Sequence, residues 1–290
     1  MVKCVCVILN YNDWEHTADI VKRVENYATF LKLVVVDNCS TDDSMKHLMK
    51  LQNEKVTVIQ STKNKGYGFG NNYGMRYAFQ KIDANAVLIC NPDVFFDEKL
   101  VVRLIGVLET YQNCGVVSAV QYDRNENEIN QSAWKIPPTW VELFSVGKIG
   151  YRLTQNNYQN AEFLHRNPIT KVDCVAGSLL LISREAFEKT GGYDENVFLY
   201  YEETILGCKM KKAGLDTYVC SDVHYLHLHG ISISKSVTSE VKRKKLLLKS
   251  HHYTLKNYLN ANCFELALDE VVGKIAIAEE YVKAAFVRVR

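Results

Sequence analysis

Short apolar runs alternate with stretches of helical spacing along the first 120 residues of the chain. The runs show no polar alternation, which is typical of strands buried on both faces, and helices between such strands indicate a parallel sheet. We predict strands at 2–9, 33–36, 56–60, 86–90 and 115–120, and helices at 14–30, 42–51, 71–81 and 97–111. The pattern therefore predicts an α/β fold, Rossmann-like, with a mostly parallel sheet flanked by helices.

The pattern is less regular in the second half of the chain. Residues 121–171 are polar, aromatic and irregular, and we expect them to cross the active-site side of the sheet. Further on, the sequence predicts strands at 172–182, 217–220 and 224–228, and a helix at 199–213 that ends at Gly214. From about residue 236 the pattern is helical and more charged. We expect one domain over residues 1–235 and a helical C-terminal extension over 236–290.

Composition narrows the class of protein. The chain has 290 residues, of which 47% are hydrophobic, so it can bury a large core. A formal net charge of only +2 does not favour a nucleic-acid partner. Three of the nine cysteines, Cys4, Cys6 and Cys90, lie inside apolar runs, and the sequence has no C-x-x-C pair. Without a secretory signal before the first strand, we expect reduced cysteines in a cytoplasmic protein.

Polar residues follow the predicted strands, where ligands of α/β sheets bind. Asn10 and Asn12 come after the first strand and could contact a base or ribose, or form an ordinary capped turn. Asp37 follows the second strand. Its carboxylate could accept the N3–H of a pyrimidine, or form an Asx turn.

A glycine-rich segment at 64–74 follows the third predicted strand. Glycines let the backbone approach a diphosphate, and the N-terminus of the next helix favours the anion. The segment is neither a Walker A loop nor a G-x-G-x-x-G fingerprint, which disfavours an NTPase or a dehydrogenase. A flexible loop is the alternative.

The fourth strand leads into Asn91-Pro92-Asp93. Magnesium typically takes one or two protein carboxylates and completes its shell with phosphate oxygens and water, and Asp93 fits that need. Asn91 could offer a neutral oxygen or bind ribose. Taken alone, this tripeptide is a common turn.

Together these segments resemble the family 2 glycosyltransferases, whose fold is called GT-A. The resemblance extends to the sequence Gly191 to Glu195, to Glu202-Glu203, and to His227 through Ser232. The matching motifs occur in family order over roughly residues 3–235. The Asn-Pro-Asp motif and the H-x-x-G-x-S motif are similar to the bacterial rhamnosyl- and galactofuranosyltransferase branch.

The resemblance implies a role for each matching residue. Asp37 would bind the pyrimidine, and Asp93 would bind a divalent metal, Mg²⁺ or Mn²⁺. His227 would complete the metal shell or hold the diphosphate. The remaining implied nucleotide-sugar contacts are Asn64, Gly66, Asn72, Asn91 and Gly177.

Two assignments leave a choice between neighbours. The family's acceptor motif usually ends in Glu-Asp with the Asp as catalytic base, whereas this sequence has Glu202-Glu203. Glu203 is therefore implied as the base, with Glu202 as the alternative. His227 and His229 share one face of a predicted strand, and the motif favours His227 as the metal ligand.

The resemblance implies an inverting, metal-dependent glycosyltransferase. The donor would be a dTDP- or UDP-sugar, with rhamnose as the first choice, and the acceptor a saccharide or a lipid-linked oligosaccharide in bacterial surface polysaccharide synthesis. One alternative is a non-catalytic nucleotide-sugar-binding module, because Asn91 and Glu203 depart from the family pattern. A sugar-nucleotide pyrophosphorylase is the other, although its N-terminal G-x-G-T-R-L-type loop is absent.

The C-terminal extension contains a basic stretch at 242–249 that includes three consecutive leucines. Basic residues beside an apolar stripe suit an anionic membrane surface, which would place the protein at the inner face of the cell membrane. A solvated helix face or a homodimer contact explains the same pattern.

Overall fold

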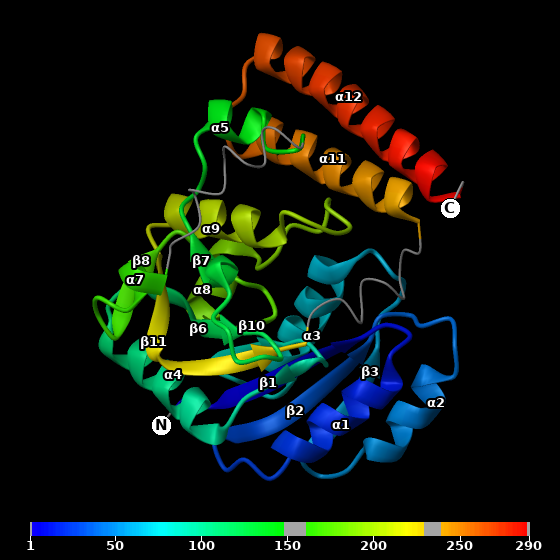
Figure 1. Cartoon of the computed structure of the whole chain (residues 1–290). Coiled ribbons are helices and arrows are strands. Elements are labelled where there is room, and N and C mark those ends of the chain that lie inside the picture. Colours follow the sequence, from blue (N-terminus) through cyan, green and yellow to red (C-terminus); the bar gives the residue numbers. More distant parts are fainter. Residues whose placement is uncertain (1, 148–160, 229–238, 289–290) are drawn as a thin grey trace.

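One mixed sheet organises the computed structural model, which describes residues 2–147, 161–228 and 239–288 (Figure 1). Within these residues the sheet has nine strands in the order β3-β2-β1-β4-β10-β6-β11-β5, with β8 also paired to β11. Strands β1 to β4 pair in parallel, whereas β10 runs antiparallel to both β4 and β6. The predicted mostly parallel sheet therefore holds for the first half of the chain, and the second half adds antiparallel strands.

The first half alternates strands and helices as the hydrophobic pattern predicts. Its elements are β1 (Cys4–Asn10), α1 (Trp14–Val24), β2 (Phe30–Asp37), α2 (Ser44–Leu48), η1 (Met49–Leu51), β3 (Val56–Gln60), α3 (Tyr67–Lys81), β4 (Ala86–Cys90), β5 (Val94–Phe95), α4 (Glu98–Thr110) and β6 (Cys114–Tyr122).

The second half contains shorter elements before two long helices. They are η2 (Asn130–Ser132), β7 (Ala133–Trp134), α5 (Thr139–Leu143), α7 (Ala161–Leu164), β8 (Ile169–Val172), β9 (Cys174–Val175), β10 (Leu179–Ser183), α8 (Arg184–Thr190), α9 (Glu202–Lys212), β11 (Asp216–His227), α11 (Glu240–Asn257) and α12 (Cys263–Arg288).

The core lies on both faces of the sheet. Alternate residues of β1 point to opposite faces, so that Cys6 and Ile8 pack against α1, α2 and α4, while Val5 and Val7 pack against α3. Strands buried on both faces need apolar side chains at every position, which explains why the sequence shows runs rather than alternation.

Several boundaries differ from the sequence prediction. The helix predicted at 71–81 begins at Tyr67, so most of the glycine-rich segment is helical rather than a loop. The predicted helix 14–30 ends at Val24, because Phe30 is buried at the start of β2. The predicted strand 172–182 is divided into β8, β9 and β10. The two short strands predicted at 217–228 form the single strand β11, whose register to β6 shifts between Cys220 and His224.

The helical extension forms an antiparallel pair, α11 and α12, above one end of the sheet (Figure 1). A small apolar cluster of Leu143, Leu255 and Leu259 joins the pair to α5. The proposed boundary at residue 235 stays a prediction. Among the helices of the described residues, none combines the length and the hydropathy that crossing a bilayer needs.

Candidate active site

A pocket of about 760 Å³ opens beyond the carboxyl ends of the central strands. Two groups of residues line it, which we call the strand-end wall and the helix wall. The strand-end wall includes Asn38, Asn64, Gly66, Tyr67, Asn91, Gly177 and His227, and the helix wall includes Glu142, Tyr201, Glu202, Glu203, Lys244 and Leu247.

Asp37 is held by a network of hydrogen bonds behind the pocket. Asn10 Nδ2 donates to Asp37 Oδ1 (2.9 Å), and Ser40 Oγ donates to the same oxygen (2.5 Å). Gln60 Nε2 donates to Oδ2 (3.0 Å). Both Asn10 and Asp37 are fully buried, so direct contact between Asp37 and a pyrimidine would need this loop to move. The role of Asp37 in base recognition stays a prediction.

The predicted contacts on the neighbouring loops also have protein partners. The Asn12 side chain is bound to Thr41, whose backbone amide donates to Asn12 Oδ1 (2.8 Å). Asn64 Oδ1 accepts a hydrogen bond from the backbone amide of Gly66 (2.9 Å) and one from Asn38 Nδ2 (3.2 Å). Asn38, which directly follows Asp37, thereby braces the glycine-rich segment at the pocket, a role that the sequence analysis did not predict.

Gly66 turns the chain into α3 with a backbone that only glycine adopts readily. Its φ is +99°, and a Cβ there would lie 1.9 Å from the carbonyl oxygen of Phe198. Asn72, in contrast, binds the segment after α8: its Nδ2 donates to Tyr193 O (2.9 Å) and to Glu195 Oε1 (3.0 Å). Asn72 therefore supports the protein around the pocket, and its predicted contact with the diphosphate stays untested.

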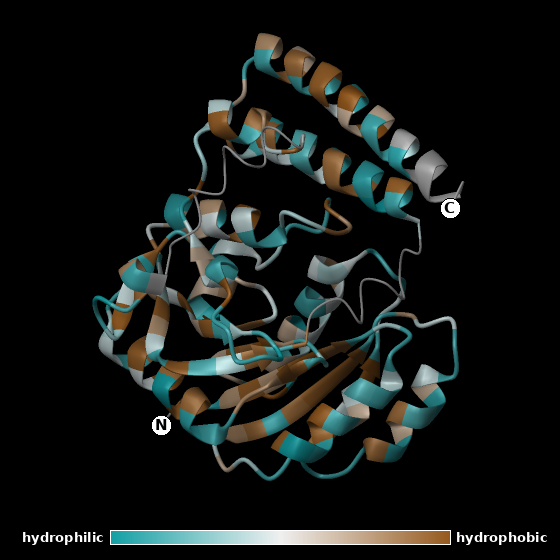
Figure 2. Ribbon diagram, in the orientation of Figure 1, coloured by the Kyte–Doolittle hydropathy of each residue, from teal (hydrophilic) through white to brown (hydrophobic). Residues whose placement is uncertain are grey.

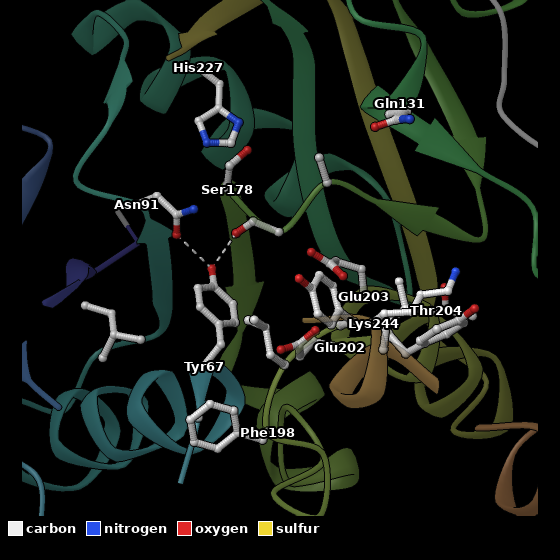
Figure 3. A pocket seen from close by; sticks show the side chains of 18 of the residues that line it. Tyr67, Asn91, Gln131, Ser178, Phe198, Glu202, Glu203, Thr204, His227 and Lys244 are labelled. Atoms are coloured by element: carbon white, nitrogen blue, oxygen red, sulfur yellow. Dashed lines mark hydrogen bonds between the residues drawn. The ribbon is translucent and has the colours of Figure 1, made fainter. Parts of the chain in front are cut away.

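Tyr67 connects two strand ends at the centre of the pocket (Figure 3). Its hydroxyl donates to Gly177 O (2.7 Å) and contacts Asn91 Oδ1 at 3.1 Å. Burial raises the pKa of Tyr67 well above its usual range, so the phenol keeps its proton. The sequence analysis missed Tyr67, although its place inside the glycine-rich segment was a signal.

Asp93 and His227 meet at the end of the pocket where β5 pairs with β11. His227 Nε2 lies 3.3 Å from Asp93 Oδ1, and Asp93 is only 3% exposed. One carboxylate and one imidazole suit Mn²⁺ or Mg²⁺ when substrate oxygens fill the rest of the shell, so these residues fit the implied metal. Among the described residues, no group of three or more His, Cys, Asp or Glu side chains is arranged so that it could hold a metal ion. His229, the alternative ligand, lies outside the described residues.

Glu202 and Glu203 occupy the first turn of α9 and face the pocket. Burial, followed by the charge of Glu203, raises the pKa of Glu202 to about 8. Its Oε1 is buried and has no hydrogen-bond partner among the described residues. Burial also raises the pKa of Glu203, and nearby backbone amides, first its own and then that of Gly177, oppose the shift. The Glu203 side chain lies against the backbone of the strand-end residue Gly177, where an added Cβ would lie 2.5 Å from Glu203 Oε1.

A strained turn directly precedes these two glutamates in the chain. Tyr200 and Tyr201 both have positive φ, 72° and 71°, which costs energy for bulky side chains. Tyr201 donates a hydrogen bond to Glu142 Oε1 (2.5 Å), and Ser145 Oγ donates to the same oxygen (2.8 Å). Tyr201 begins the matching Tyr201-Glu202-Glu203 segment, but Glu142 lies far away in sequence and in no motif, so sequence analysis could not have paired them.

A family model described as Glycosyl transferase family 2 matches residues 5–191, more than half of the chain. The chain belongs to glycosyl transferase family 2. This confirms the resemblance drawn from the strand-end motifs, and with it the expected class of enzyme.

Curated relatives agree with this assignment at low identity. The chain is 25% identical over 222 residues to the low-salt glycan biosynthesis hexosyltransferase Agl10 of Haloferax volcanii, covering 76% of this chain and 66% of that protein. It is also 25% identical over 235 residues to an N-acetylglucosaminyl-diphospho-decaprenol L-rhamnosyltransferase of Mycobacterium tuberculosis, covering 77% and 76%.

Among solved structures, the fold matches a mannosyltransferase of Pyrobaculum calidifontis in complex with GDP-Man and Mn²⁺. The TM-score is 0.58 at 16% identity, over 100% of this chain and 81% of that chain. The GT-A fold is thereby confirmed. The roles of individual site residues rest on the geometry described above.

Proposed function

We propose that the protein transfers a sugar from a nucleotide-diphosphate donor to an acceptor hydroxyl with inversion at the anomeric carbon. The observation that carries the proposal is the buried Glu202-Glu203 pair in a pocket that also holds His227 and the braced glycine-rich loop. A base at one end and metal-ligand chemistry at the other are what direct displacement of a diphosphate needs.

Glu203 is the better candidate for the base. Its carboxylate lies against the Gly177 backbone, and the nearby backbone amides lower its pKa and so favour the charged form. Glu203 would take the proton from the acceptor hydroxyl as the new glycosidic bond forms. Glu202, whose pKa is raised to about 8, keeps its proton at neutral pH and can donate a hydrogen bond to the substrate.

The donor diphosphate would lie against the glycine-rich loop and the N-terminus of α3. Asp93 and His227 would hold a divalent metal there, and a bound metal supplies charge stabilisation for the leaving diphosphate. Tyr67 orients the Asn91 amide and the Gly177 carbonyl in this region, so it serves as a positioning residue.

We propose a dTDP- or UDP-sugar as the donor, with rhamnose first, because several curated relatives are rhamnosyltransferases. The acceptor would be a saccharide or lipid-linked oligosaccharide of surface polysaccharide synthesis, since one relative's name specifies a diphospho-decaprenol acceptor.

A thermal-shift screen tests the donor assignment. It compares dTDP-rhamnose, UDP-galactofuranose, UDP-glucose and UDP-galactose, each with and without Mn²⁺. We expect one donor to raise the melting temperature, and Mn²⁺ to enlarge that shift. Slow release of nucleotide diphosphate from the same donor would separate an enzyme from a binding module. Binding without any turnover, with or without acceptor, would contradict the proposal.

A further inference from the structure

Exposed apolar side chains gather at one end of the molecule. Among the described residues, half of the large hydrophobic side chains that are exposed lie on α12 or at α5. They are Trp140, Phe144, Phe264, Val271, Ile275 and Tyr281. Figure 2 shows the corresponding hydrophobic positions along α12, the outermost helix. The other exposed apolar residues are spread over β2, η1, β5, α4 and the loops.

On α12 these residues form a stripe. Phe264, Val271 and Ile275 are spaced seven and four residues apart, so they share one face of the helix. Their exposed fractions are 76%, 51% and 57%. The opposite face packs on α11, where Asp269 pairs with His252. Among the described residues, therefore, α12 turns an apolar stripe outward.

A basic stripe runs beside it on α11. This helix carries six lysines or arginines and one glutamate, in a chain whose formal net charge is only +2. Lys242, Lys245 and Lys249 are exposed and lie on one helical face. Lys245 Nζ is 3.4 Å from the hydroxyl of Tyr281, which is exposed on α12 beside the face that carries the stripe, so the basic residues reach the exposed side chains of α12.

The leucines of the basic stretch have a different place from the one its sequence suggested. Leu247 lines the pocket, and Leu248 packs toward Gly273 of α12. The apolar side chains of this exposed surface therefore come from α12 and α5, which lie outside the basic stretch in the sequence.

We propose that this surface, which we call the hairpin face, docks on an anionic lipid bilayer. It consists of Trp140, Phe264, Val271, Ile275 and Tyr281 beside Lys242, Lys245 and Lys249. The apolar side chains enter the boundary between head groups and acyl chains, and the lysines meet lipid phosphates. A second copy of the chain, which would present the same exposed lysines of α11, matches their charge less well than an anionic surface does.

Docking also orients the pocket. Lys244, Leu247 and Lys283, on the inner side of the same two helices, line the far end of the pocket. Bilayer contact therefore places that end near the membrane, where a lipid-linked acceptor would enter. This consequence rests on the proposed function, whereas docking itself does not.

Vesicle co-sedimentation of the full chain tests the proposal. Phosphatidylcholine vesicles are compared with vesicles that also contain phosphatidylglycerol, at low and high salt. We expect binding only to the anionic vesicles, weakened by salt. The double variant Lys245→Gln/Lys249→Gln should bind about tenfold or more weakly, since each basic residue near the surface contributes several-fold. Phe264→Ser/Ile275→Ser should lose a similar amount.

Matched controls lie on α4, away from the hairpin face. Val102→Ser removes an apolar side chain that is 56% exposed, and Lys99→Gln removes an exposed lysine. Neither should change vesicle binding. Absence of wild-type binding, or equal loss in the α4 variants, would overturn the proposal. A dimer in sedimentation velocity that Ile275→Ser dissolves would assign the face to a second copy instead.

Donor hydrolysis, measured without lipid, separates this proposal from the proposed function. The hairpin-face variants should hydrolyse the donor at the wild-type rate. If they bind vesicles poorly but keep hydrolysis, docking and catalysis are independent. If wild-type protein binds vesicles but never hydrolyses any donor, only the proposed function fails.

Discussion

The polar groups on the two sides of the pocket differ in how well their hydrogen bonds are satisfied. On the strand-end side, Asn10, Asp37 and Asn38 are bound by neighbours, and the loops between them are braced. On the helix wall, two carboxyl groups are buried side by side, and Glu202 Oε1 has no partner among the described residues. The strand-end wall resembles a preformed scaffold, whereas the helix wall holds groups whose burial is costly.

The difference indicates how the work is divided between the walls. A braced wall loses little conformational entropy when a donor binds, because its loops are already held in place, although contact between Asp37 and a base would still need the loop after β2 to move. A wall with buried carboxyls and a strained tyrosine turn has shifted pKa values, which general-base chemistry requires. Substitutions that affect one wall and leave the other intact test whether donor binding and catalysis are divided in this way.

The largest effect should come from Glu203→Gln. Loss of the base should reduce the transfer rate by about 10²- to 10⁴-fold, while donor affinity stays near the wild-type value. Steady-state transfer and donor titration by calorimetry measure the two quantities. Glu202→Gln is the matched variant one position away. If Glu202→Gln abolishes transfer and Glu203→Gln does not, the roles of the two residues must be exchanged.

A smaller effect is expected at the other end of the pocket. Asp93→Asn and His227→Ala should each weaken Mn²⁺-dependent donor binding by about tenfold or more, because they remove proposed ligands. Calorimetric titration of Mn²⁺ in the presence of donor measures this loss. Donor binding without Mn²⁺ should change much less. Equal losses with and without the metal would indicate a structural role for the pair.

The buried carboxyl pair should also make stability depend on pH. The pKa of Glu202 rises from 4.5 to about 8 on folding, so the folded state binds more protons between these values. The free energy of unfolding should therefore fall as pH rises through this window, by up to about 1.4 kcal/mol per pH unit from this group. Glu202→Gln, which carries no charge, should flatten the profile in urea unfolding. A parallel profile would show that Glu202 is not the group responsible.

The smallest effect should come from Tyr67→Phe. Removing the hydroxyl deprives Gly177 O and Asn91 of a donor and should lower the free energy of unfolding by about 1–2 kcal/mol. We expect donor affinity to fall several-fold, because the Asn91 amide is no longer oriented. Tyr73→Phe on the same helix is a suitable control. An unchanged donor affinity would remove Tyr67 from the positioning role.

Much of the fold could be predicted because the strands are buried on both faces. The strands β3 and β4 have the predicted bounds, since runs such as Ala86–Cys90 are continuous and end at polar residues. The segment 172–182 was wrong as a single strand, because an apolar run does not reveal where the chain crosses between sheets. Phe30 was assigned to a helix, since one aromatic residue satisfies either period.

By itself the sequence determined the parallel half of the sheet, the family, and the strand-end residues from Asn10 to Asp93. These are local properties, because a strand end and its loop are contiguous in the chain. Only the tertiary structure decided which groups meet: Asp93 with His227, Gly177 with Glu203, and Tyr201 with Glu142. The tertiary structure also showed that the C-terminal helices line part of the pocket, and that α12 carries the exposed apolar residues of this helical pair. Such contacts depend on packing between distant segments, which local spacing does not encode.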